Sequence, residues 1–160
     1  MKTFETFYFI GYSFDPRSLK ASFSYSFDHE VNFTETIDFA CPWFRPISVI
    51  DAEIMKTLLF HLSLAVGISY YKLYPTKNLI LEHWSLNEDQ KSFWKTFYLQ
   101  GLGEFLFRNN ISPQELINFI NGKTSSPKKQ FSINSTTPLI ALWWGKDSFC
   151  LLYTSDAADE

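Results

Sequence analysis

The chain has 160 residues, of which 46% are hydrophobic and 19% aromatic, so it can bury the core of one ordinary domain, and this composition excludes intrinsic disorder. Its formal net charge is −3, and residues 1–149 hold 14 acidic and 14 basic side chains. This balance argues against the basic surface that nucleic-acid binding requires, so we expect no nucleic-acid partner.

The two cysteines, Cys41 and Cys150, exclude a disulfide framework and a cysteine-based zinc site, and the three histidines share no ligand spacing, so no metal site is expected. The longest apolar segment, Leu58 to Ile68, is interrupted by His61 and Ser63 and is shorter than the roughly 18 residues of a membrane span. We therefore expect a soluble, cytoplasmic protein in which this segment is a buried helix and His61 is a hydrogen-bonded side chain.

The first forty residues alternate apolar and polar side chains with the period of β-strands. Polar turns of hairpin length lie at Asp15–Ser18 and Asp28–Glu30. The pattern predicts a three-stranded antiparallel sheet with these residues on its apolar positions: Phe7, Phe9, Ala21, Phe23, Tyr25, Phe27, Phe33, Ile37 and Phe39.

From Ser48 the period changes to that of a helix, with a capping-box pattern at Ser48–Asp51 and an end near Gly67. Its apolar side chains spread nearly all round, which indicates a central helix buried on several sides. We expect its inner face to carry Ile54, Leu58, Leu62, Ala65 and Val66.

After a short strand at Leu79–Leu81, a second helix is predicted to begin at Ser85–Glu88 and to direct Phe93, Phe97 and Leu102 inward. Gly101 and Gly103 weaken such a helix by about 1 kcal/mol each relative to alanine, so they indicate a bend or close packing.

A third helix is predicted to begin at Ser112, with Pro113 in its first turn and Glu115 reaching back to the cap. Its buried face would hold Leu116, Phe119 and Ile120, and Gly122 would end it. Residues 123–137 are rich in Ser, Thr, Lys and Pro, a composition typical of a linker.

Residues 138–149 are predicted to form a buried strand followed by a turn, Gly145–Lys146–Asp147–Ser148, whose backbone N–H groups can converge on a phosphate. This turn resembles the PP-loop of ATP pyrophosphatases, which convert ATP to AMP and pyrophosphate. The final residues, Cys150–Glu160, resemble a translated sequencing adapter, so we interpret them as a non-biological tail.

Three further segments stand in an order typical of one family: Gly11–Asp15, Gly67–Lys72, and Gly101–Phe105 with Arg108 and Asn109. Together with the terminal turn, they make residues 4–149 resemble the N-terminal portion of the UDP-N-acetyl-α-D-muramoyl-L-alanyl-L-glutamate epimerase family. The resemblance implies an enzyme that uses ATP and Mg²⁺ to invert the terminal L-glutamate of a UDP-activated muramoyl dipeptide, UDP-MurNAc-L-Ala-L-Glu, in peptidoglycan synthesis.

The chemistry that the family implies is activation of a carboxylate before proton transfer. Adenylylation cancels the carboxylate charge, so the α-proton of the acyl-adenylate can be removed and returned on the opposite face. The resemblance implies that ATP binds at Gly145, Lys146, Asp147 and Ser148. The chain departs from the family pattern at Trp143 and Trp144, where that pattern has two glycines, and two indole side chains do not suit such a turn. We expect the 160-residue chain alone to be inactive.

Lys72 and Tyr71 are candidate site residues because they follow Gly67 in the segment that carries the resemblance. The Lys72 ammonium can pair with a substrate carboxylate or phosphate, and the structural alternative is a solvated lysine after a helix. Tyr70 and Tyr71 lie on different faces, so one is expected in the core and the other, assigned here as Tyr71, at the substrate.

Glu104, Arg108 and Asn109 are the remaining candidates, with Glu104 catalytic and the other two substrate-binding. Glu104 lies between Gly103 and Phe105, where apolar surroundings would raise its pKa toward that of a general base. The alternatives are an exposed helical ion pair between Glu104 and Arg108 and a helix C-terminal cap at Asn109.

The sequence therefore predicts an α+β protein: an N-terminal domain of antiparallel strands and helices over residues 1–122, a linker over 123–137, the truncated start of an α/β PP-loop domain over 138–149, and the tail at 150–160. Two other functions stay open. One is a different PP-loop enzyme, an amide ligase or a tRNA-modifying enzyme, against which the neutral charge argues. The other is a non-enzymatic, aromatic-rich binding module.

Overall fold

The computed structural model describes residues 3–39 and 52–123. The predicted capping box at Ser48–Asp51 and the predicted PP-loop strand and turn lie outside the described residues. In the described ranges the elements follow one another as β1 (Thr6–Asp15), β2 (Lys20–Phe27), β3 (Val31–Asp38), α1 (Ala52–Tyr71), β4 (Asn78–Leu81), α2 (Glu88–Gly101), α3 (Gly103–Arg108), a 3₁₀ turn (Pro113–Glu115) and β5 (Asn118–Asn121).

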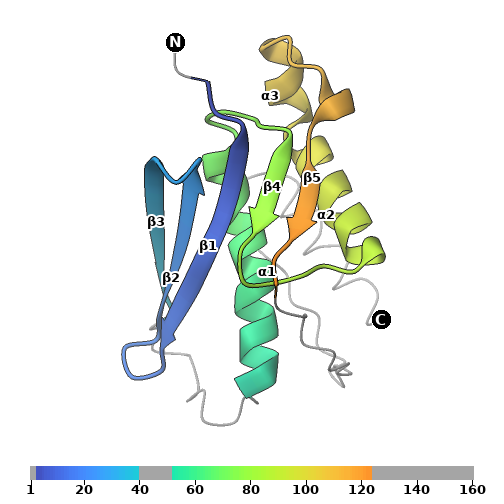
Figure 1. Cartoon of the computed structure of the whole chain (residues 1–160). Helices are drawn as coiled ribbons and strands as arrows, with labels where there is room; N and C mark the ends of the chain where they lie inside the picture. Colours follow the sequence, from blue (N-terminus) through green and yellow to red (C-terminus); the bar gives the residue numbers. More distant parts are fainter. Residues whose placement is uncertain (1–2, 40–51, 124–160) are drawn as a thin grey trace, which may run out of the picture. The chain divides into compact units, whose positions relative to one another are not determined.

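The strands form one mixed sheet in the order β3-β2-β1-β4-β5 (Figure 1). The predicted antiparallel arrangement of β1, β2 and β3 is confirmed, and so is the short strand β4. The expectation of antiparallel strands alone is incomplete, because β4 lies parallel to β1 and β5 lies parallel to β4. A parallel neighbour requires a long crossover, and α1 and the α2–α3 segment provide the two crossovers.

The helices pack on one face of the sheet, and the core lies between the two layers. Alternate strand residues point into it, as the period-two pattern predicts. Gly67 lets α1 approach the sheet closely, because a Cβ at this position would lie 2.6 Å from Cε1 of Phe9. The most completely buried large side chains are Tyr25, Tyr71, Tyr98, Phe7, Phe9, Phe23, Phe27, Phe60, Leu64, Leu79, Leu81 and Ile117.

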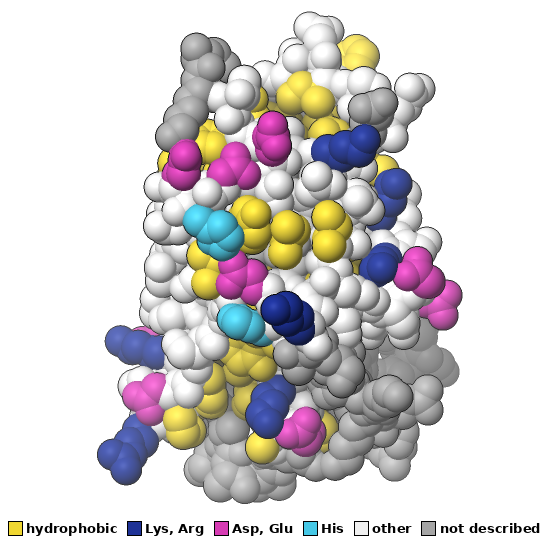
Figure 2. Space-filling model, viewed as in Figure 1, with side chains coloured by type: hydrophobic (Ala, Val, Ile, Leu, Met, Phe, Trp, Pro, Cys, Tyr) yellow, Lys and Arg dark blue, Asp and Glu magenta, His cyan; other side chains and the backbone are white. Residues whose placement is uncertain are grey.

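In Figure 1 none of the described helices lies on the opposite face of the sheet, and Figure 2 shows the side chains of this face. Tyr8, Ile80 and Ile120 are in register across β1, β4 and β5, and a short row of apolar side chains crosses the middle of this face. On β2 the same face has Ser22, Ser24 and Ser26. The antiparallel part of this face is thus polar, as is usual for an antiparallel sheet with one side toward water.

The predicted end of α1 near Gly67 is wrong, and its predicted inner face is confirmed only in part, since Leu62, Ala65 and Val66 pack against the core. The helix continues past Gly67 to Tyr71, because this glycine serves close packing and not helix termination. Its buried residues include Leu59, Phe60 and Leu64, whereas Leu58 is 49% exposed. A helix with apolar residues nearly all round does not indicate from its sequence which side contacts the sheet.

By length and composition, α1 is the one helix in the described part of the chain that could cross a membrane, with a mean hydropathy of 1.3. The core helix of a water-soluble protein passes the same test. Here 28% of the apolar window is buried, and Phe60 and Leu64 of α1 pack into the core against the sheet.

The predicted orientation of α2 is also wrong. The helix begins within the predicted segment Ser85–Glu88, where Asn87 is its cap: the Asn87 Oδ1 accepts a hydrogen bond from the Gln90 N–H at 2.8 Å. Phe93 and Phe97 are 61% and 42% exposed, while Trp94 and Tyr98 point inward. The two aromatic pairs have the same four-residue spacing, so periodicity could not distinguish them.

The inward pair is selected by hydrogen bonds that phenylalanine cannot form. Tyr98 donates its hydroxyl hydrogen to the Leu64 carbonyl at 2.6 Å, and Trp94 Nε1–H donates to His61 Nδ1 at 3.2 Å. Both acceptors belong to α1, so these two bonds fix α2 against it. The prediction that His61 is a hydrogen-bonded side chain is confirmed.

The third predicted helix, over residues 112–122, is wrong as well. Only a 3₁₀ turn forms at Pro113–Glu115, Ser112 makes no side-chain capping bond, and the chain then enters β5. Pairing with β4 outweighs the helix-start signal, and it buries Phe119 while Ile120 stays 38% exposed. Leu102, in contrast, is buried as predicted, at the bend between α2 and α3.

The His61–Trp94 bond makes the stability of the chain depend on pH. Burial lowers the pKa of His61, so the unfolded chain binds this proton more readily than the folded chain does. The contribution of His61 is therefore complete above its ordinary pKa of about 6.5 and is lost as the pH falls below that value. We expect His61→Gln, which keeps an acceptor but does not titrate, to weaken the loss of unfolding free energy between about pH 7.5 and about pH 5.5.

The measurement is urea unfolding of the 160-residue chain at both pH values. The exposed His83 provides the matched control, since its side chain is 67% exposed. An unchanged pH slope in His61→Gln, or an equal change in His83→Gln, would contradict the prediction.

Candidate functional site

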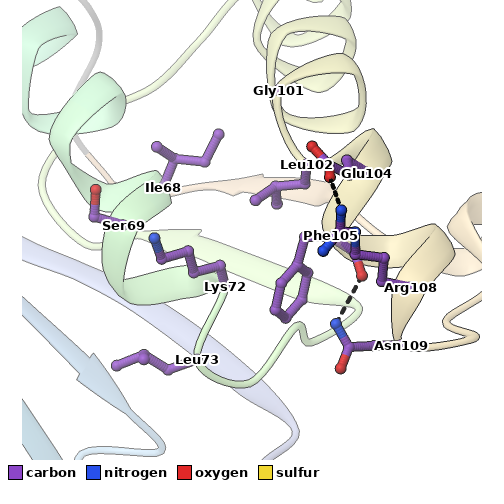
Figure 3. A pocket seen from close by; sticks show the side chains of 10 residues that line it. All are labelled: Ile68, Ser69, Lys72, Leu73, Gly101, Leu102, Glu104, Phe105, Arg108 and Asn109. Carbon is purple, nitrogen blue, oxygen red and sulfur yellow. Dashed lines mark hydrogen bonds and ion pairs between the residues drawn. The ribbon is translucent and has the colours of Figure 1, made fainter.

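A cavity of about 730 Å³ lies between the C-terminal end of α1 and the α2–α3 bend. It is open on one side, and it contains four of the residues that the sequence singled out: Lys72, Glu104, Arg108 and Asn109 (Figure 3). Lys72 directly follows α1, and the other three come from α3 and its end. Residues more than thirty positions apart in the sequence thus line one cavity.

The floor of this cavity is apolar, and sequence reasoning assigned no role to its residues. Ile68 and Leu73 come from α1 and the residues after it, Leu102 from the helix bend, and Phe105 from α3. The Phe105 ring lies between Lys72 on one side and Arg108 on the other (Figure 3). Spacing could have indicated both residues, since Ile68 lies four positions before Lys72, which continues the hydrogen bonding of α1, and Phe105 lies three positions before Arg108 on α3.

Glu104 and Arg108 form an ion pair across one turn of α3. Arg108 Nη2 lies 2.7 Å from Glu104 Oε1, and the two side chains are 73% and 76% exposed, respectively. The exposed helical pair is confirmed, and the apolar surroundings expected for Glu104 are not found. Because both partners are exposed, this pair is expected to stabilise α3 by only a few tenths of a kcal/mol.

Asn109 caps α3, as the alternative interpretation predicted. Its side-chain amide donates to the Phe105 carbonyl at 2.8 Å, and its backbone N–H also donates to the Phe105 carbonyl, at 3.1 Å. A contact with substrate stays a prediction.

Lys72 brings a positive charge to the cavity that no carboxylate in the described part of the chain neutralises by an ion pair. Its side chain is exposed, and its backbone N–H donates to the Ile68 carbonyl at 3.1 Å, which continues the hydrogen bonding of α1. A cation beside an apolar floor suits a ligand that has both an anionic and an apolar part.

Tyr71 does not line the cavity. It is completely buried, and its hydroxyl donates to the Thr76 carbonyl at 2.7 Å. Burial raises the pKa of Tyr71. Tyr70 lies on the other side of the helix, where its hydroxyl donates to Glu35, and this bond raises the pKa of Tyr70. The expectation that the two tyrosines lie on different faces is confirmed, with Tyr71 in the core, and a substrate contact for Tyr71 stays a prediction that this placement does not favour.

Residues 3–39 and 52–123 contain no group of three or more His, Cys, Asp or Glu side chains that could hold a metal ion. The residues predicted to bind ATP, Gly145 to Ser148, lie outside the described residues. Because the cations Lys72 and Arg108 line the described cavity, it is a candidate site for an organic anion.

Comparisons with known proteins agree on one family. The model of the MurL N-terminal domain family matches residues 1–155, a range that includes the predicted linker and the predicted PP-loop segment. The chain is similar to UDP-N-acetyl-alpha-D-muramoyl-L-alanyl-L-glutamate epimerase from Xanthomonas oryzae pv. oryzae (strain MAFF 311018), at 28% identity over 148 residues. This alignment covers 89% of the chain and 32% of the relative, so the chain spans about a third of the relative's length. No solved structure matches the chain.

Proposed function

Because the chain belongs to the MurL N-terminal domain family, we propose that it is the N-terminal part of an epimerase that inverts the terminal glutamate of UDP-MurNAc-L-Ala-L-Glu. The observation that carries this proposal is the cavity in which Lys72, Glu104, Arg108 and Asn109 meet. The similarity to a relative named as this epimerase supports the choice of substrate.

In this proposal the cavity binds an anionic part of the substrate. The Lys72 ammonium pairs with a carboxylate or phosphate, and Arg108 provides a second cation that Glu104 holds in place at 2.7 Å. Among the residues that the structure describes, Glu104 is the one carboxylate that lines the cavity, so it is the candidate to exchange a proton with a bound ligand. The apolar floor around Phe105 excludes water from one side of that ligand.

The proposed reaction uses ATP and Mg²⁺ to convert the glutamate carboxylate to an acyl-adenylate, which makes the α-proton acidic enough to be removed and returned. Since the described residues hold no cluster of metal ligands, we propose that ATP and Mg²⁺ bind elsewhere in the complete protein, with Gly145, Lys146, Asp147 and Ser148 at the phosphates. A cytoplasmic location is part of the proposal, and so is the inactivity of the 160-residue chain alone.

The test is the complete protein with UDP-MurNAc-L-Ala-L-Glu and ATP, in which the D- to L-glutamate ratio after hydrolysis and the release of AMP are measured. We expect Lys72→Ala to lower kcat/KM at least about tenfold, which corresponds to about 1.4 kcal/mol of transition-state stabilisation. Lys77→Ala, at an exposed lysine outside the cavity, should change kcat/KM less than about twofold.

The two parts of the proposal fail separately. If the complete wild-type protein does not interconvert the two glutamate configurations, the proposed reaction is wrong. If the wild-type protein is active and Lys72→Ala has the wild-type kcat/KM, the reaction stands and the cavity is not its substrate site.

A further inference from the structure

The outward side of α2 carries two phenylalanines that the core does not use. Phe93 and Phe97 are 61% and 42% exposed, and their rings stack with centroids 6.3 Å apart and an interplanar angle of 25°. We call them the Phe93–Phe97 face. An amphipathic helix at a water-exposed surface usually presents polar side chains there, so two adjacent hydrocarbon rings indicate a surface that another element covers.

The distribution of aromatic residues on α2 strengthens this point. The inward positions are taken by Trp94 and Tyr98, which carry polar atoms, whereas the outward positions have rings without polar atoms. Burial of the phenylalanines in place of this pair would lose two hydrogen bonds to α1. The two hydrogen bonds to α1 therefore set the orientation of α2 and leave the phenylalanine rings on its outward side, where they can contact another element.

The described chain ends beside the start of α2. Asn121, the last residue of β5, bonds to both backbone groups of Leu86: its Oδ1 accepts from the Leu86 N–H and its Nδ2–H donates to the Leu86 carbonyl, both at 2.9 Å. The Gly122 N–H donates to the Trp84 carbonyl at 2.9 Å. Since Trp84 and Leu86 lead directly into α2, the described chain ends beside the first turn of the helix whose middle carries the Phe93–Phe97 face.

The curated relative is much longer than the region that this chain matches. The chain covers 32% of that protein and belongs to a family of N-terminal domains. We propose that the Phe93–Phe97 face is the docking surface for the part of the complete protein that lies beyond this chain. The inference rests on family membership and on the geometry of α2, and it does not depend on the reaction proposed above.

Cross-linking of the complete protein with an amine-reactive reagent, followed by mass spectrometry, tests this docking. In the sequence of α2, Lys91 precedes Phe93 by two positions and Lys95 lies between Phe93 and Phe97. In the wild-type protein we expect cross-links from these lysines to residues beyond position 160. The double variant Phe93→Glu/Phe97→Glu should reduce them at least about tenfold, and the single variant Phe97→Ser should reduce them to an intermediate extent.

Phe107→Glu is the matched control, because Phe107 is 83% exposed but lies on α3. In this variant the cross-links from Lys91 and Lys95 should be as abundant as in the wild type. Hydrogen exchange of α1 and β1 reports whether each variant keeps its fold. Absence of the cross-links in the wild type, or their persistence in the folded double variant, overturns the proposal. A wild-type dimer in sedimentation that the double variant abolishes also overturns it, because the occupant would then be a second copy.

Discussion

Gly122→Ala is expected to destabilise the chain by at least about 3 kcal/mol, at the upper end of the usual cost of overpacking. A Cβ at this position would lie 2.2 Å from both the Leu81 and the Glu82 carbonyl oxygens. These neighbours are backbone atoms of β4 and the residue after it, so they cannot rotate away as a side chain can. Relief requires the separation of β5 from β4, and this exposes Phe119 to water.

Urea unfolding of the 160-residue chain measures this loss. Gly103→Ala is the matched control, because its added Cβ meets nothing within 4 Å and alanine favours the helix by up to about 1 kcal/mol. We expect the control to be as stable as the wild type or slightly more so. A Gly122→Ala variant as stable as the control would show that β4 and β5 are not packed in this way.

Phe7→Ala is expected to destabilise the chain by about 3–5 kcal/mol, the usual cost of truncating a buried phenylalanine. Phe7 is fully buried in the centre of the sheet, and its ring lies within 5.8 Å, centroid to centroid, of the rings of Phe9, Tyr25, Phe27 and Tyr71. Removal of the ring leaves a cavity among rigid aromatic neighbours that cannot collapse into it.

The same truncation at an exposed site separates packing from composition. Phe107→Ala removes an identical side chain that is 83% exposed, so we expect a loss below about 1 kcal/mol. Thermal and urea unfolding of both variants provide the comparison. Equal losses in the two variants would mean that Phe7 does not lie in the core.

The sequence predicted an element correctly where its pattern of apolar residues is compatible with only one arrangement of neighbouring strands. Alternation over residues 7–39 led to β1, β2 and β3, because hairpin turns connect neighbouring strands directly. The strand at Asn118–Asn121 was missed, since Ser112 and Pro113 form a strong helix-start signal and the partner strand β4 lies forty residues earlier. Strand pairing over that distance has no signature in a four-residue segment.

In the candidate site, too, contacts between residues close in the sequence could be predicted, and contacts between distant residues could not. Spacing alone indicated that Glu104 and Arg108 could pair, and they do. That Lys72 would line the same cavity could not be derived from spacing, because the approach of α1 to α3 depends on how α1 packs on the sheet and how α3 packs on α2. The residues predicted to bind ATP stay outside what the structure describes, so their role remains a prediction.

The order of the sheet has a consequence for biosynthesis. β1, β2 and β3 are complete by residue 38 and need only tight turns to pair, whereas β4 and β5 must wait for helical crossovers. During translation the three-stranded meander therefore leaves the ribosome with one face made of uncovered aromatic rings. Until α1 has been synthesised and packs on that face, its aromatic side chains can associate with other unfolded chains.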